Sequence, residues 1–169
     1  REEAGTPNIL GAITLGASIH VLHSIGMDLI LEEDLSLTNY AISEMKKHDD
    51  LYIYGDTNSN ECMRTGTISF NVIGMDHGLV ASILNDYFNI AVRNECFCAH
   101  PYVEKMLHNT HNKQINSLDC QDDHLQWTVE PWMGMVRASF GLYNTEYDIN
   151  SLIKALSKII NNKDYYIQR

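Results

Sequence analysis

Apolar residues recur at helical spacing in the first part of the chain. Residues 7–24 are apolar on most sides, which is typical of a helix buried on several faces. Thr6 suits the cap before this helix, Pro7 suits its first position, and Gly26 is expected to end it. A second helix is expected over residues 30–47, where an apolar stripe recurs at steps of four and three: Leu31, Leu35, Thr38, Ile42 and Met45.

The apolar period then changes to two, which is the period of strands. Short strands are expected at residues 51–55, 65–74, 90–93 and 136–142. In the last of these, Val136, Ala138 and Phe140 face one way, and Arg137 faces the other. A half-buried sheet produces this alternation, so Arg137 is expected on a face away from the main core.

Two further helices complete the pattern. Asp76 can cap one of them, and Thr145 with Asp148 forms a capping box for the last. The order of elements predicts an α+β fold, with a small mixed or antiparallel sheet covered by helices. Residues 106–134 are polar and are expected to form an irregular, insertion-like loop, and the tail is expected to fray.

Composition narrows the function classes. The net charge of −10 would repel a phosphate backbone, and there is no cluster of basic residues, so nucleic-acid binding is not expected. No apolar run is long enough to span a membrane. The low density of cysteines, at positions 62, 96, 98 and 120, favours free thiols in the cytoplasm. A chain that starts at Arg1 is expected to have been processed or cut.

Two places could bind anions. Gly5 and Thr6 precede a helix, where a small residue, a hydroxyl group and free N–H groups suit a phosphate, although an ordinary helix cap has the same sequence. Arg137 could bind a carboxylate through two parallel hydrogen bonds, or could form a surface salt bridge. The residue types alone leave both alternatives open.

The stretch VRNECFCAHPYV, residues 92–103, has three interpretations. Cys96, Cys98 and His100 could contribute to a zinc site, with further ligands from His108, His111, Cys120 or His124. One residue between the cysteines is closer than structural zinc sites usually have, so no metal site is predicted. The cysteines could instead be buried thiols, or one could be a nucleophile on a loop, with Cys98 the better placed.

Several motifs together resemble one family. EAGTPNILGAI, TISFNVIG, VASIL, IAVRNECFCAHP and VRASFGLYNTEYDI are similar, in this order, to the C-terminal part of class V aminotransferase-fold enzymes. The nearest pattern is that of the cysteine desulfurases and selenocysteine lyases, which use pyridoxal phosphate. The resemblance implies a cofactor-contacting loop and connecting helix at residues 1–29 and a C-terminal small domain at residues 30–169.

The resemblance also implies roles for single residues. Thr6, beside Gly5, matches the threonine that binds the cofactor phosphate of the partner subunit in a homodimer. Arg137 matches the arginine that binds the carboxylate of a cysteine-like substrate, and Arg93 matches a supporting arginine. Cys98 matches the cysteine that takes sulfur from the substrate, releases alanine and can pass the sulfur to an acceptor protein.

The chain departs from the family pattern at three places. Glu95 stands where the desulfurases usually have glycine, and Phe97 where they usually have histidine. The negative charge of Glu95 is expected to raise the pKa of a nearby thiol such as that of Cys98, and so to weaken it as a nucleophile. The family's cofactor-binding lysine, which follows Ser-x-His in an N-terminal domain, has no counterpart in these residues. The alternatives are therefore a lyase, epimerase or transaminase of the same family without a thiol step, or a non-catalytic zinc-binding or interaction module.

Overall fold

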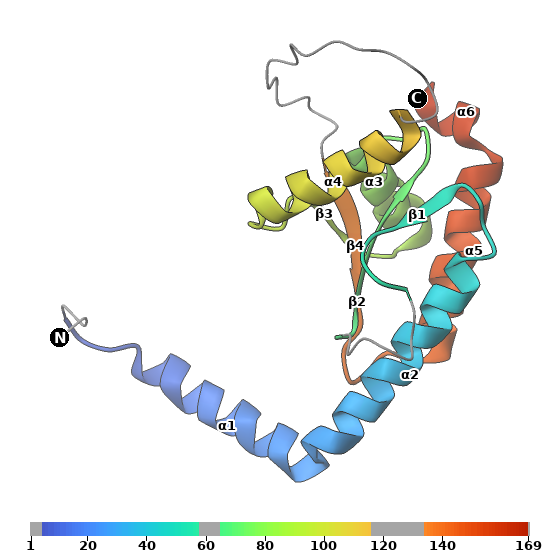
Figure 1. Cartoon of the computed structure of the whole chain (residues 1–169). Helices are drawn as coiled ribbons and strands as arrows, with labels where there is room; N and C mark the ends of the chain where they lie inside the picture. Colours follow the sequence, from blue (N-terminus) through green and yellow to red (C-terminus); the bar gives the residue numbers. More distant parts are fainter. Residues whose placement is uncertain (1–4, 58–64, 116–133, 169) are drawn as a thin grey trace.

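The computed structural model describes residues 5–57, 65–115 and 134–168, and the side chains of the helix after residue 99 are described as far as His108. Four strands form one antiparallel sheet in the order β1-β2-β4-β3 (Figure 1). The strands are β1 (Leu51–Ile53), β2 (Thr67–Val72), β3 (Arg93–Glu95) and β4 (Met135–Ser139). The predicted α+β fold is confirmed, and the sheet is antiparallel within the described residues.

Three helices cover one face of the sheet: α2 (Met27–Met45), α3 (His77–Phe88) and α5 (Glu146–Asn161). The core between them and the sheet includes Phe70 of β2, Val136 of β4 and Leu84 of α3, which are all fully buried. As predicted, β2 and β4 alternate, so that Ile68, Val136 and Ala138 face this core while Arg137 faces the other side.

The opposite face of the sheet is only partly covered. Helix α4 (His100–Ile115) lies over it, and its Val103 packs with Tyr54 and Met135 in a second, smaller apolar cluster. The prediction of an irregular loop from residue 106 is wrong as far as residue 115, because the helix continues to there. The rest of that polar stretch, up to residue 133, lies outside the described residues, as do Cys62, Cys120 and His124.

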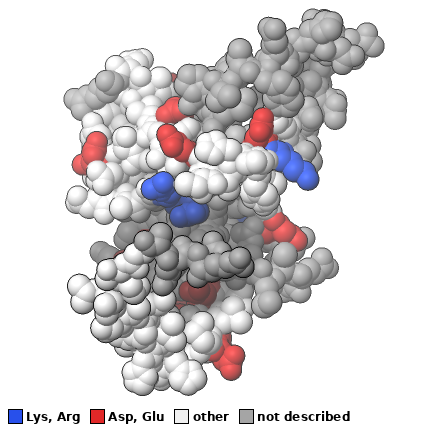
Figure 2. All heavy atoms as spheres, turned by 90° about the vertical axis from the view of Figure 1, so that its left-hand side faces the viewer, with Lys and Arg blue, Asp and Glu red and all other residues white. Residues whose placement is uncertain are grey.

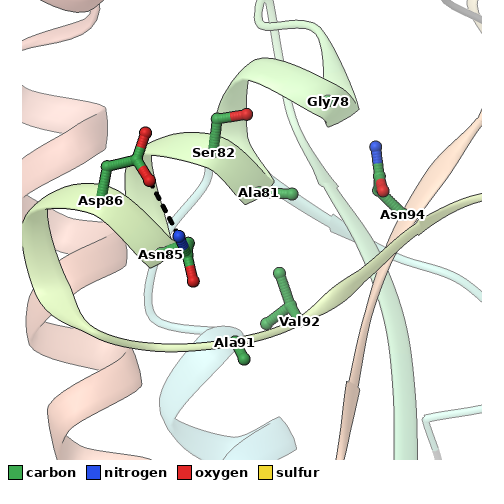
Figure 3. A pocket seen from close by; sticks show the side chains of 8 residues that line it. All are labelled: Gly78, Ala81, Ser82, Asn85, Asp86, Ala91, Val92 and Asn94. Carbon is green, nitrogen blue, oxygen red and sulfur yellow. Dashed lines mark hydrogen bonds between the residues drawn. The ribbon is translucent and has the colours of Figure 1, made fainter.

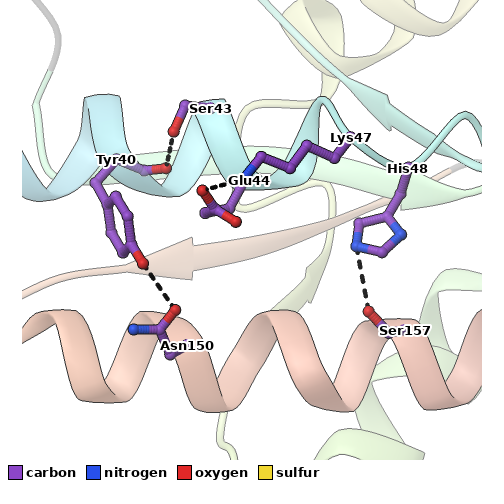
Figure 4. Close-up of polar contacts among 7 residues, drawn as sticks. All are labelled: Tyr40, Ser43, Glu44, Lys47, His48, Asn150 and Ser157. Atoms are coloured by element: carbon purple, nitrogen blue, oxygen red, sulfur yellow. Dashed lines mark hydrogen bonds and ion pairs between the residues drawn. The ribbon is translucent and has the colours of Figure 1, made fainter.

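Helices α2 and α5 run side by side and join through both apolar and polar side chains (Figure 4). Tyr40 Oη donates a hydrogen bond to Asn150 Oδ1 at 2.8 Å, and Ser157 Oγ lies 3.2 Å from His48 Nε2. At the start of α5, the Thr145 N–H donates to Asp148 Oδ2 at 2.9 Å, which confirms the predicted capping box. The tail forms a short helix, α6 (Lys163–Ile167), instead of fraying, and Lys163 is paired with Asp50.

Helix α1 (Ile9–Ile25) differs from the prediction in two ways. Its cap is Asn8, whose Oδ1 accepts from the Gly11 N–H at 2.9 Å, so Thr6 does not cap it. None of its residues is buried; Leu10, for example, is 76% exposed. Figure 1 shows that α1 projects away from the sheet and meets the beginning of α2, so its apolar sides have almost no packing partner among the described residues. Gly26 ends it, as predicted, and α2 begins directly at Met27.

Within the described residues, no single helix has the length and composition needed to cross a membrane. Helices α1 and α2 taken together pass the same test, but they are bent by 79° where they meet.

Candidate active site

Two arginines lie opposite each other on the edge strand β3 and its neighbour β4. Arg93 of β3 pairs with Arg137 of β4 in the antiparallel register. Directly opposite residues of an antiparallel pair point to the same face, and like charges placed there repel each other. In the described part of the chain, neither guanidinium forms an ion pair with a carboxylate. The pair therefore favours an anion that can bind between or beside the two groups.

Arg137 retains unused hydrogen-bonding capacity. The residue is half-buried, and its Nε atom is buried with no hydrogen-bond partner among the described residues. A buried donor without a partner costs about 1–3 kcal/mol. A ligand that accepts a hydrogen bond from this side chain would recover that cost, and a carboxylate does so with two oxygens.

The residues next to Cys98 form a tight turn. The Ala99 N–H donates to the Cys96 carbonyl oxygen at 2.7 Å, and the two central residues, Phe97 and Cys98, have positive φ angles of 52° and 59°. Two central residues of positive φ define a type I′ turn. The turn follows β3 directly and leads into α4, and it exposes Cys98 while leaving Cys96 half-buried. It thus presents the predicted nucleophile on the outside of a sharp bend.

The turn and Arg137 line the same cavity, which has a volume of about 220 Å³. Its walls are Tyr54, Ser69, Phe97, Ala99, Tyr102, Val103, Met135 and Arg137. Apolar walls with one convergent cation are typical of a site for a small molecule with an anionic end. Figure 2 views the molecule from the left-hand side of Figure 1 and shows a hollow across its middle, with basic side chains at its border.

The ring of Phe97 covers the guanidinium of Arg137. The distance from Arg137 Cζ to the ring centroid is 4.9 Å, which is a cation–π contact. Phe97 also packs against the cluster of Tyr54, Val103 and Met135. The turn that carries Cys98 is therefore in direct contact with the arginine that could bind a carboxylate.

Tyr54, which lines the cavity, is hydrogen-bonded to Asn71 beside it. The Asn71 side-chain amide donates to Tyr54 Oη at 3.1 Å and to the Gly134 carbonyl oxygen at 2.9 Å. Burial raises the pKa of Tyr54 to about 12; the hydrogen bond from Asn71 lowers it, and the neighbouring Tyr52 raises it further. Tyr54 is therefore an uncharged hydroxyl group at neutral pH.

The two thiols have different surroundings. Burial raises the pKa of the Cys96 thiol, and the carboxylates of Glu95 and Glu104 raise it further. The carboxylate of Glu95 therefore disfavours the thiolate of Cys96. Within the described residues there is no group of three or more His, Cys, Asp or Glu side chains that could hold a metal ion.

Gly5 and Thr6 do not reach the cavity within this chain. Both are exposed just before α1, and an added Cβ at Gly5 would meet no atom within 4 Å. The N-terminal end lies far from the sheet in Figure 1. The structure brings Arg137 and the turn around Cys98 to one cavity. It places Arg93 opposite Arg137 on β3 but not among the residues that line the cavity, and it leaves Gly5 and Thr6 apart from them.

A second hollow, of about 290 Å³, lies between α3 and β3 (Figure 3). It is lined mainly by small and amide side chains, and Asn85 Nδ2 donates to Asp86 Oδ1 at 2.8 Å across its rim. It contains none of the predicted site residues.

Comparison with known proteins agrees with the resemblance seen in the sequence. A profile of the aminotransferase class-V family matches residues 1–152, so the chain belongs to this family. A probable cysteine desulfurase of Halobacterium salinarum is 33% identical over 156 residues, which are 92% of this chain and 31% of that protein. A cysteine desulfurase of Escherichia coli O139:H28 is 31% identical over 159 residues, 94% of this chain and 32% of that protein.

Solved structures show the same likeness. The apo structure of a cysteine desulfurase from Thermococcus onnurineus NA1 matches with a TM-score of 0.72 and 29% identity, over 95% of this chain and 33% of that chain. The cysteine desulfurase CsdA of Escherichia coli shares the fold, with a TM-score of 0.70 and 23% identity. This chain therefore spans about a third of the length of the relatives it matches.

The sequence pattern did not single out Tyr54 and Ser69, which line the cavity, Asn71, which supports Tyr54, or the contact of Phe97 with Arg137. Ser69 alternates with core residues on β2, and Tyr54 continues the alternation just after β1, so the strand period places both on the face of Arg137. That signal was present in the sequence. The Phe97 contact depends on the positive φ of a non-glycine residue, which no local pattern indicates.

Proposed function

We propose that this chain is the C-terminal part of a pyridoxal-phosphate-dependent cysteine desulfurase. The observation that supports this most directly is the shared cavity: Arg137 and both neighbours of Cys98 line one hollow. An anion-binding group and an exposed thiol beside one small apolar cavity suit an amino acid that carries a carboxylate and a sulfur atom.

Arg137 binds the substrate carboxylate in this proposal, and Arg93 supports it. The unpartnered Nε of Arg137 and the opposed guanidinium of Arg93 both favour an anion at this place. The cavity of about 220 Å³, with Tyr54, Phe97 and Tyr102 among its walls, suits a small side chain.

Gly5 and Thr6 are assigned to the phosphate of pyridoxal phosphate. An exposed hydroxyl and open backbone before a helix fit that anion, and their distance from Arg137 in the same chain suits a site completed by a second subunit in a homodimer. The cofactor, held by a lysine of an N-terminal domain, supplies an electron sink for the substrate's α-carbon. The proposed domain division remains residues 1–29 and 30–169.

Cys98 takes the sulfur. Its thiolate forms a bond to the sulfur atom of the substrate while the bond between that sulfur and the substrate's Cβ breaks. The product on the enzyme is a persulfide at Cys98, and the remaining fragment takes up a proton and leaves as alanine. The exposed position of Cys98 on the turn suits the later transfer of sulfur to an acceptor protein. A reducing compartment such as the cytoplasm suits both free thiols.

The test uses the full-length protein that contains this chain, loaded with pyridoxal phosphate. Cys98→Ser should abolish the release of sulfide from cysteine, while the cofactor absorbance still responds to the substrate. Cys96→Ser is the matched control and should leave the activity within about threefold, because Cys96 is half-buried and its thiol is harder to ionise.

Mass spectrometry of trapped persulfides locates the sulfur directly. Sulfane sulfur on Cys96 alone would reverse the assignment of the two thiols. Full activity in the double serine variant would end the desulfurase proposal and favour a lyase, epimerase or transaminase that needs no thiol. Stoichiometric zinc in the purified protein, without cofactor, would favour the non-catalytic alternative.

A further inference from the structure

The Phe97 side chain connects Arg137 on β4 with the turn that carries Cys98. Arg137 is fixed on β4, in the middle of a hydrogen-bonded sheet. Cys98 belongs to a turn outside the sheet, closed by the hydrogen bond from the Ala99 N–H to the Cys96 carbonyl oxygen. The ring of Phe97 spans the gap, with its centroid 4.9 Å from Arg137 Cζ.

We propose that Phe97 is a positioning residue, whose ring, resting on Arg137, holds the turn that carries Cys98 against the carboxylate-binding arginine. A ring that covers the flat face of a guanidinium leaves the N–H groups at its edge free. The contact with Phe97 and the binding of a carboxylate are therefore compatible. The distance between the substrate's anionic end and the thiol is then set by one aromatic ring.

The backbone of the turn makes this anchor necessary. Phe97 and Cys98 both hold positive φ angles, a conformation that side chains with a Cβ adopt at a cost. Without an external contact, the chain would relax toward extended or right-handed geometry. The stacking of Phe97 on Arg137, together with its packing against the cluster of Tyr54, Val103 and Met135, opposes that relaxation.

The first test measures hydrogen exchange at the Ala99 amide in this 169-residue chain, because that amide closes the turn. Phe97→Leu keeps an apolar side chain but removes the ring, and Arg137→Met keeps the length but removes the cation. Each is expected to speed exchange at Ala99 by about two- to fivefold, the loss of one partly exposed cation–π contact. Phe97→Tyr keeps the ring and should retain the wild-type rate.

The double variant decides whether the two residues act through each other. If they do, Phe97→Leu with Arg137→Met exchanges no faster than the faster single variant. The reference is the Leu79 amide, which is bonded to Asp76 Oδ1 at the start of α3 and should not change in any variant. Multiplied effects in the double variant, or unchanged exchange at Ala99 in both single variants, would overturn the proposal.

The consequence for sulfur transfer rests on the proposed function and is tested in the cofactor-loaded full-length protein. Phe97→Leu should lower kcat for cysteine by up to about two- to fivefold with little change in KM, because a turn that is less often docked slows the thiol step and leaves the carboxylate contact intact. Coupling at Ala99 without turnover in the wild type would refute the proposed function alone. Turnover without coupling would refute the role of Phe97 alone.

Discussion

Glu95, Phe97 and Cys98 concentrate backbone strain beside the candidate site. Their φ angles are 78°, 52° and 59°, and none of them is glycine. Each left-handed residue with a Cβ costs about 1–2 kcal/mol relative to right-handed geometry. The resembling desulfurases usually have glycine at the position of Glu95, which is the residue that adopts such an angle without cost. Glu95 in place of glycine therefore lowers the stability of the fold, in addition to adding a negative charge.

Glu95→Gly is expected to increase the free energy of unfolding by about 1 kcal/mol, because glycine at φ 78° is unstrained. Chemical denaturation measures this. Glu95→Ala is the matched control, since it removes the charge but keeps the Cβ, and it should give no comparable gain. Both variants should lower the pKa of the Cys96 thiol, which Glu95 raises, and the pH dependence of alkylation reports that change. Equal stabilisation by both variants would contradict the strain argument.

Arg137→Ala should lower kcat/KM for cysteine in the full-length protein by a factor that corresponds to about 2–4 kcal/mol. The reason is that the substrate carboxylate would lose a charge-assisted, two-pronged partner. Arg137→Lys should restore little of this loss, because an ammonium group cannot form the parallel pair of hydrogen bonds. Arg93→Ala, on the more exposed partner, should cost less. Steady-state kinetics that leave the alanine variant near normal would remove Arg137 from the site.

At the level of elements, the alternation along β2 and β4 predicted both faces of the sheet correctly. The caps at Asp76 and Thr145 were also correct, because each depends on a few neighbouring residues. The cap of α1 was wrong because Asn8 and Thr6 are both good caps, and the backbone uses the later one. The prediction that α1 is buried was wrong. Apolar residues on several sides of a helix indicate that it packs against other segments, but they do not show that those segments belong to this chain.

In the candidate site, too, the features that depend on neighbouring residues could be predicted and those that depend on distant contacts could not. Arg137 could be placed from strand period. The strand expected at residues 90–93 lies at Arg93–Glu95 instead, so only its last residue was placed in the sheet, and the pairing of Arg93 with Arg137 depends on the order β4-β3. The turn at Phe97 and Cys98 could not be derived, because sequence rules assign positive φ to glycine or asparagine and these residues are neither. Helix α4 was also not predicted. Its sequence contains Pro101 and many polar residues and shows no clear apolar stripe, and its few apolar contacts are with residues on the face of the sheet.

Tyr54 links strand β1 to the pH dependence of stability. Its pKa is raised from 10.0 to about 12, mainly by burial, so the folded protein keeps this proton where the unfolded chain releases it. The stabilisation from this residue is complete below pH 10.0 and is lost as the pH rises toward about 12. Tyr54→Phe should therefore lose less stability over this interval than the wild type does. Denaturation at several alkaline pH values tests it, and parallel curves for the two proteins would contradict it.

On the scale of the whole molecule, the chain has one well-packed part and one exposed helix. The core under α2, α3 and α5 is closed, whereas Leu10, Ile13 and Leu15 of α1 are each more than half exposed. Exposed apolar residues gathered on one helix are typical of a surface that other protein covers. The proposed site is divided in the same way, since Gly5 and Thr6, which we assign to the cofactor phosphate, precede that helix at its end away from α2.

The isolated chain is expected neither to hold pyridoxal phosphate covalently nor to turn over cysteine. The lysines of this chain occur without the Ser-x-His context of the resembling enzymes. Reduction with borohydride in the presence of the cofactor, followed by peptide mapping, measures covalent attachment. A single lysine labelled at one equivalent would show that this chain holds the cofactor by itself, against the proposed division into domains.

The order β1-β2-β4-β3 affects when the candidate site can form while the chain is being synthesised. Strand β4 is the last of the four along the chain, yet it lies between β2 and β3, and β3 has no other partner in the described sheet. Until the chain has been synthesised to residue 139, β4 is incomplete, so β3 lacks the strand with which it forms hydrogen bonds. Contacts between distant segments form slowly, because a long loop must close first. The turn that carries Cys98 and the strand that carries Arg137 can therefore come together only after β4 has been made, which places the cavity between them late in the assembly of the sheet.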